Sequence, residues 1–244
     1  MEITPDEIVI WSWGAVKINA TLIFTWVVMA MLVLSSWAVT RRLRSGVEIS
    51  AGQHALEAII ATIRSQIQGI SGQDAARYLP FIASLYLFIA VANLLGFVPG
   101  YEPPTGSLST TAALALLVFL AVPVYSIAQR GVRGFLRHYI EPTPFMLPFH
   151  VIGDISRTIA LAVRLFGNVM SGTLVVAVLL SITPLFFPVI MQVLELVIGQ
   201  VQAFIFAVLA MVYIASAASV QREREGHSNT TETGATDAER QSPE

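Results

Sequence analysis

The chain has 244 residues, of which 55% are hydrophobic and 12% are charged, whereas a soluble domain carries roughly 25% charged residues. This composition excludes an ordinary soluble globular protein. The formal net charge of −2 argues against nucleic-acid binding, which needs a basic face that neutralises phosphates. Because the chain has no cysteine, disulfide bonds, iron–sulfur clusters and thiolate zinc sites are also excluded.

The sequence has no pattern that is typical of a metal or nucleotide site. Its four histidines lie far apart along the chain and lack metal-ligand spacing. Its single lysine, Lys17, lies outside any glycine-rich loop, so the phosphate-binding loop motif is missing. We therefore expect no metal, cofactor or nucleotide. The acidic N-terminal segment lacks a basic region and does not resemble a cleaved signal peptide.

The hydrophobic pattern predicts five membrane spans, because a bilayer is crossed by about 20 apolar residues. At the N-terminus, Thr4 to Glu7 resembles the start of a further helix, with a proline at its first position. The spans are expected at about 18–40, 78–101, 107–129, 155–183 and 186–220. Pro123 is expected to kink the third span. These segments form a single membrane domain over 1–220, and the polar stretch 221–244 is expected to be a disordered cytoplasmic tail.

The segment 50–72, between the first two predicted spans, has the pattern of an amphipathic helix. Its apolar residues recur at helical spacing, and Glu57 and Arg64 lie on the opposite face. We expect this helix to lie along the membrane surface.

Basic residues predict the orientation, because cytoplasmic loops carry an excess of Lys and Arg. The loops after the first and third spans contain Arg41, Arg42, Arg44, Arg64, Arg77, Arg130, Arg133 and Arg137. The opposite side has only Lys17. The N-terminus is therefore expected outside and the C-terminus in the cytoplasm.

The last two spans are expected to form a hairpin around a turn at Pro184. Arg164 lies 20 residues before Pro184 and Gln202 lies 18 after it, so both lie roughly 27 to 30 Å along their helices. We expect them to face each other at one level. Thr173 and Glu195 each lie 11 residues from Pro184, which is about 16 Å along each helix from the turn. They should therefore form a second facing pair, closer to the turn.

Arg164 is the most unusual residue, because an arginine at the centre of a span costs about 2.5 to 3.5 kcal/mol and normally faces a partner or a water-filled cavity. A structural salt bridge with Glu195 is one interpretation, but about 7 residues, roughly 10 Å, separate the two along the hairpin. A guanidinium keeps its proton at ordinary pH. Arg164 is therefore a fixed positive charge that cannot relay a proton.

Glu195 can bind and release a proton, which makes it a candidate relay. The alternative is a carboxyl group that faces an aqueous vestibule without a transfer role. Asn168 and Gln202 are weaker candidates, because each can line an ion path or form only an interhelical hydrogen bond. Thr173 is a further lining candidate opposite Glu195.

Three segments carry a family resemblance. Leu161 to Asn168 resembles the RLFGN helix of subunit a of rotary F-type ATP synthases. Gln202 to Phe206 is similar to the QAFIF segment of that family, and Asn93 to Gly100 resembles the exit of its second span. The match covers roughly Tyr78 to Ser219.

The resemblance implies an all-α polytopic membrane protein with about five embedded helices, a surface amphipathic helix and a long final hairpin beside a rotating ring of c subunits. It implies a stator subunit whose two offset half-channels pass protons, or sodium ions, to and from the ring carboxylates, with the arginine matching Arg164 between them. Such a subunit is not an enzyme on its own and binds no nucleotide. The implied partners are the c ring, b-type peripheral stalk subunits and membrane lipid, in a bacterial inner membrane.

One position departs from the family. The family usually pairs two ionisable residues, commonly a glutamate and a histidine, at the positions matching Thr173 and Glu195. Thr173 cannot titrate, so Glu195 is expected to act alone or with water.

Three other functions remain as alternatives. A self-contained ion transporter or channel would conduct ions as the purified chain alone. An intramembrane enzyme would need a nucleophile with a base, or paired carboxylates at one depth, and the sequence predicts neither. A purely structural anchor would leave the polar residues of the last two spans unexplained.

Overall fold

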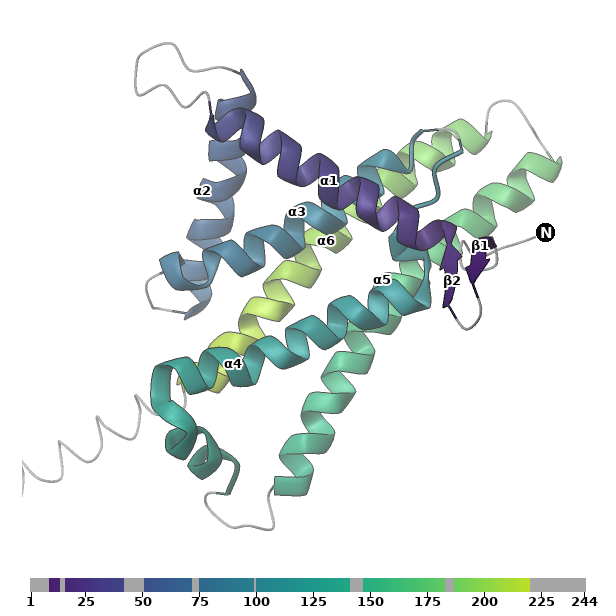
Figure 1. Ribbon diagram of the computed structural model, residues 1–244. Helices are drawn as coiled ribbons and strands as arrows, with labels where there is room; N and C mark the ends of the chain where they lie inside the picture. Colours follow the sequence, from purple (N-terminus) through teal and green to yellow (C-terminus); the bar gives the residue numbers. More distant parts are fainter. Residues whose placement is uncertain are drawn as a thin grey trace, which may run out of the picture.

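The computed structural model describes residues 9–13, 16–41, 51–71, 75–98, 100–140, 147–182 and 187–219. The chain starts with two strands and continues through long helices (Figure 1). The elements are β1 (Val9–Trp13), β2 (Val16–Asn19), α1 (Ala20–Thr40), α2 (Ala51–Ser71), η1 (Ala75–Arg77), α3 (Leu79–Leu95), η2 (Pro104–Gly106), α4 (Leu108–Ile140), α5 (Leu147–Ile182) and α6 (Phe187–Ser219).

The fold is that of a helical membrane protein. Among the described residues, α1, α4, α5 and α6 are long and apolar enough to cross a bilayer, and α3 is a shorter apolar helix of 17 residues. Each predicted span overlaps one of these five helices, but α4 continues to Ile140, beyond the predicted 129, and α5 begins at Leu147, before the predicted 155. Residues 183–186, around Pro184, and the predicted tail 221–244 lie outside the described residues.

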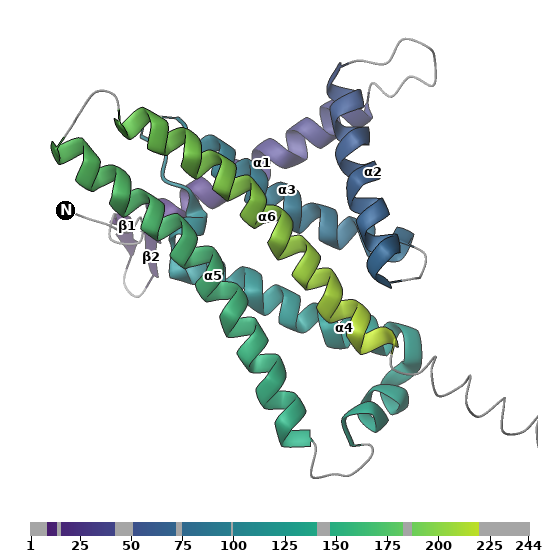
Figure 2. The ribbon, with the colours of Figure 1, turned by 180° about the vertical axis from the view of Figure 1, so that it is seen from behind.

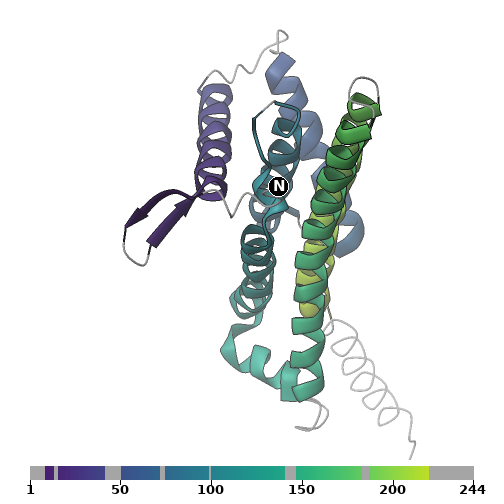
Figure 3. The same cartoon turned by 90° about the vertical axis from the view of Figure 1, so that its right-hand side faces the viewer.

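The helices form three layers in the side view (Figure 3). The antiparallel pair α5 and α6 forms one layer, α3 and α4 form the next, and α1 lies on the far side. The core lies where α3, α4, α5 and α6 meet, and its fully buried side chains include Ile89, Val118, Leu165 and Phe206. Most of α1 remains exposed, as expected for a helix whose surroundings are lipid.

The predicted amphipathic helix is α2, which packs against α3 and α6. Ile63 and Ile67 are buried, whereas Glu57, Arg64 and Gln68 are exposed. In Figure 1, α2 crosses the direction of its neighbours instead of running alongside them. The alternation of apolar and polar residues at helical spacing therefore produced the expected one-sided burial.

Three local features differ from expectation. The hairpin β1–β2 directly follows Thr4 to Glu7, where a helix start was expected, although those four residues lie outside the described ones. Its strands are rich in β-branched and aromatic residues, which favour extended structure. Helix α3 ends at Leu95, short of the predicted 101, and the next N–H, of Gly96, bonds to the Asn93 carbonyl in a tightened last turn.

The third difference lies in α4. Its helical geometry breaks at Gly131, where φ is 71° and ψ is 167°, and not at Pro123. A positive φ is accessible to glycine without a steric cost, so Gly131 can take the bend.

Candidate functional site

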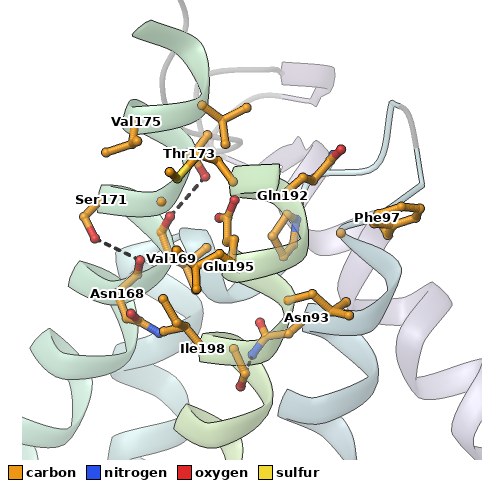
Figure 4. Close-up of a pocket in the computed structure, with 18 of the residues that line it drawn as sticks. Asn93, Phe97, Asn168, Val169, Ser171, Thr173, Val175, Gln192, Glu195 and Ile198 are labelled. Carbon is orange, nitrogen blue, oxygen red and sulfur yellow. Dashed lines mark hydrogen bonds between the residues drawn. The ribbon is translucent and has the colours of Figure 1, made fainter. Parts of the chain in front are cut away.

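A cavity of about 370 Å³ lies between α5, α6 and the loop that follows α3 (Figure 4). Its wall includes Glu195 and Gln192 from α6, Thr173 and Asn168 from α5, and Asn93 from the end of α3. Together with Ser171 and Glu102, these polar groups gather in a wall whose other residues are mostly apolar. The lining residues of the hairpin fall within 168–176 of α5 and 191–199 of α6, so the cavity lies toward the end of the hairpin where α5 ends and α6 begins. The view from behind shows these two helices side by side (Figure 2).

Glu195 packs directly onto α5. Its carboxyl group lies beside the side chain of Thr173 in the cavity wall (Figure 4), so the structure brings these two residues together. The neighbouring Gly172 makes this approach possible, because a Cβ atom at that position would lie only 2.6 Å from Glu195 Oε1. The carboxyl group therefore occupies the space that any other residue at 172 would fill.

The Thr173 hydroxyl donates to the backbone oxygen of Val169 at 3.0 Å and lies beside the Glu195 carboxyl group (Figure 4). A hydroxyl has one proton to donate and lone pairs that accept. Thr173 can therefore donate to an ionised Glu195, or donate to Val169 while it accepts from a protonated Glu195. The hydroxyl adapts to both charge states of the carboxyl group without titrating itself.

Arg164 lies outside the cavity, one helical turn beyond Asn168, which lines its inner end. Its side chain is exposed, and no hydrogen bond or ion pair joins it to another of the described residues. The structural salt bridge between Arg164 and Glu195 is therefore not formed. A permanent charge on an apolar helix instead faces outward.

Gln202 and Arg164, which were expected to face each other, differ in their surroundings. Gln202 is 7% exposed, whereas Arg164 is exposed. The Gln202 Nε2 is buried without a hydrogen-bond partner among the described residues. Among the described residues, no hydrogen bond joins these two side chains.

Arg157 has partners that were not predicted. Its Nη1 lies 3.5 Å from Asp154 Oδ1, and its guanidinium lies 5.6 Å from the centre of the Tyr213 ring. The contact with Asp154 lies within α5, and the contact with Tyr213 joins the early part of α5 to the late part of α6, at the end of the hairpin away from the cavity.

Two cavity residues were missed as site candidates. Asn93 was noted only as part of a motif, although its amide bonds to α6. Glu102 lies in the loop after α3 and also lines the cavity. The sequence did contain a signal for Glu102, because it is a single charged residue between two long segments without charge. Within the part of the chain that the structure describes, no group of three or more His, Cys, Asp or Glu residues is placed to hold a metal ion.

Comparison with known proteins identifies the family. The family model described as ATP synthase A chain matches residues 22–215. The chain is 60% identical to ATP synthase subunit a 2 of Acaryochloris marina over 222 residues, which cover 91% of this chain and 95% of that protein. It is 54% identical to subunit a 1 of Crocosphaera subtropica over 227 residues (93% and 99%), and 52% identical to subunit a of Nitrosospira multiformis over 229 residues (94% and 91%). The chain therefore belongs to the ATP synthase A chain family.

Proposed function

We propose that this chain is the membrane stator of a rotary ATP synthase and guides protons, or sodium ions, to and from carboxylates on a ring of c subunits. The observation that carries the proposal is Arg164, an exposed cation on the long apolar helix α5 without a partner among the described residues. A charge in this setting is costly unless a partner or water faces it. A carboxylate on a neighbouring rotor would be such a partner. The chain would not be an enzyme on its own.

The cavity is suited to be one of the two half-channels. It brings Glu195, Thr173 and Asn168 to one opening, and it ends one turn short of Arg164. An ion that entered here would be held at Glu195 and then passed to a ring carboxylate facing the hairpin. Gln192 and Glu102 supply further polar groups along the same wall.

Arg164 would separate the two half-channels by electrostatics. Its guanidinium cannot give up its proton at working pH, so a free cation moving along the hairpin is repelled. A ring carboxylate that reaches Arg164 is stabilised in its ionised form and so releases its ion. The ion then leaves by the other half-channel. The separation of the half-channels conserves free energy. Moving one charge through 100 mV releases about 2.3 kcal/mol, and an ion that leaked past Arg164 would release this free energy as heat.

The proposed setting is a bacterial inner membrane, with the N-terminus outside and the C-terminus in the cytoplasm. The excess of arginine in the loops after the first and third spans supports this orientation. The cavity would then open toward the outside. The proposed partners are the c ring along α5 and α6, b-type peripheral stalk subunits and membrane lipid.

A self-contained transporter or channel is the competing function. The high identity to proteins named ATP synthase subunit a, over nearly their whole length, does not favour it. The two can be separated by reconstituting the purified chain alone in liposomes. A stator without its ring should not conduct, whereas a channel should.

The proposal is tested by Arg164→Ala in the assembled complex. We expect ATP-driven ion pumping in inverted vesicles to be abolished, while ATP hydrolysis by the detached catalytic sector is unchanged. Arg157→Gln, on the same helix but in contact with Asp154 and Tyr213, is the matched control and should retain pumping. Pumping at the wild-type rate in Arg164→Ala would refute the proposal.

A further inference from the structure

Asn93 connects three elements through both ends of its amide. Its Nδ2 donates to the backbone oxygen of Gly199 in α6 at 2.9 Å (Figure 4), and its Oδ1 accepts from Thr105 Oγ1 at 2.9 Å. Thr105 lies in η2 and is fully buried. Because the oxygen end is occupied by Thr105, the amide cannot flip, and its nitrogen end remains directed at α6.

The absence of a side chain at Gly199 leaves room for the Asn93 side chain against the backbone of α6. A Cβ atom at position 199 would lie 3.1 Å from both Cβ and Nδ2 of Asn93, which is closer than ordinary carbon contacts of about 3.5 to 4.0 Å. A side chain at position 199 would push Asn93 away by a few tenths of an ångström, so glycine favours this close approach of α6 to Asn93. The two residues therefore fix the separation of α3 and α6 at this level.

This contact lies at the floor of the cavity. Asn93 and Gly199 both line it, as does Asn168 on α5, whereas Arg164 and Gln202, each about one turn further along, do not. Glu195 lies four residues before Gly199 and so projects from the same face of α6. A displacement or rotation of α6 at Gly199 would therefore move the Glu195 carboxyl group.

We propose that Asn93 is a positioning residue that fixes α6 at the cavity floor and thereby holds Glu195 against Gly172 and Thr173. The inference rests on the proposed function, because it names what sets the geometry of that ion path. Its contacts are distinct from those of Arg164, so the two proposals can fail separately.

The chain offers a matched control in Gln200. Its Nε2 donates to the backbone oxygen of Ala90 at 2.9 Å, which is also a side-chain amide bond between α3 and α6. Gln200 does not line the cavity. Replacing it removes an interhelical bond of the same kind without touching the floor.

A disulfide reporter can measure the position of residue 195 directly, and the chain has no native cysteine to interfere. The ideal Cβ at position 172 lies 3.0 Å from Glu195 Cγ. A cysteine at 195 would place its Sγ near that Cγ, and about 3 Å is the spacing from one Cβ to the partner sulfur that disulfide geometry requires. The double variant Gly172→Cys, Glu195→Cys should therefore cross-link readily in membranes.

The test compares the oxidation rate of this pair in three backgrounds of the assembled complex. With Asn93→Leu we expect cross-linking to be about fivefold slower, since a net hydrogen bond of about 1 kcal/mol corresponds to that factor. With Gln200→Leu we expect the rate of the unaltered background. Equal rates in all three backgrounds, or equal slowing in both variants, would overturn the proposal.

A second measurement covers loss of assembly. If Asn93→Leu does not accumulate in membranes, Thr105→Val decides, because it removes only the bond that anchors the Asn93 oxygen. Slower cross-linking in Thr105→Val supports the proposal, and an unchanged rate refutes it. In chains that retain Gly172 and Glu195, the pH profile of ATP-driven pumping should shift in Asn93→Leu but not in Gln200→Leu. None of the cross-linking rates depends on whether Arg164→Ala abolishes pumping.

Discussion

Gly172→Ala separates the stability of the hairpin from its function, because the two should change in opposite directions. Alanine in a helix interior is favoured over glycine by roughly 0.5 to 1 kcal/mol. The added methyl group, however, would lie 2.6 Å from Oε1, 2.7 Å from Cδ and 3.0 Å from Cγ of Glu195. Ordinary contact needs about 3.5 Å, so the carboxyl group must move by about 1 Å. It is the mobile end of a flexible side chain, and the movement costs little stability.

A shift of about 1 Å in a reacting group can lower a rate by about a hundredfold. We therefore expect ATP-driven pumping by Gly172→Ala to fall by about tenfold to a hundredfold, while the amount of assembled complex and its thermal stability stay the same or rise. The assay is ion uptake into inverted vesicles at matched ATP hydrolysis capacity.

Gly153→Ala is the control for this experiment. Gly153 lies on the same helix, and a Cβ atom there would meet nothing within 4 Å, so pumping should be unchanged. Wild-type pumping by Gly172→Ala would show that the position of the Glu195 carboxyl group does not matter. A large loss of assembled complex would contradict the expectation that Glu195 yields easily.

Two further substitutions test single groups of the cavity. Glu195→Gln keeps the size of the side chain but cannot exchange a proton, so coupled transport should slow by at least about tenfold; an unchanged rate from pH 6 to 9 would leave Glu195 without a transfer role. Burial raises the pKa of Tyr101 above its ordinary value, so ionisation above about pH 10 favours the unfolded chain and lowers stability there. Tyr101→Phe should remove this alkaline loss, and should not destabilise the complex at pH 7, because the buried hydroxyl has no hydrogen-bond partner among the described residues. Thermal melting of the purified complex at pH 10.5 measures the alkaline loss, and melting at pH 7 measures the effect of removing the hydroxyl. A lower melting temperature of Tyr101→Phe at pH 7 would contradict the expectation that the hydroxyl adds no stability.

Features that follow from a local repeat could be predicted from the sequence. The surface helix α2 shows its buried and exposed faces in the spacing of Ile63, Ile67 and Arg64. The pairing of Thr173 with Glu195 follows from equal distances along two helices that share a turn. Both arguments use only helical geometry and the cost of polar groups in lipid.

Features that depend on contacts between distant segments could not be predicted. Asn93 and Gly199 are separated by 106 residues, and no local pattern indicates that an amide at the end of one helix bonds to the backbone of another. The same holds for Gly172, whose importance comes from the side chain opposite. Pro123 was the stronger local signal in α4, yet it lies inside the helix, and the non-helical backbone angles fall at Gly131, which has a positive φ.

The central claim is that Arg164 is a fixed charge directed at a rotor and not a structural partner within its own chain. A map of the assembled complex that resolves side chains tests it most directly. We expect the guanidinium on the face of α5 that meets the ring, within about 4 to 6 Å of a ring carboxylate, the range in which opposite charges shift each other's titration. A guanidinium turned inward and paired with Glu195 or Asp154 would contradict the account.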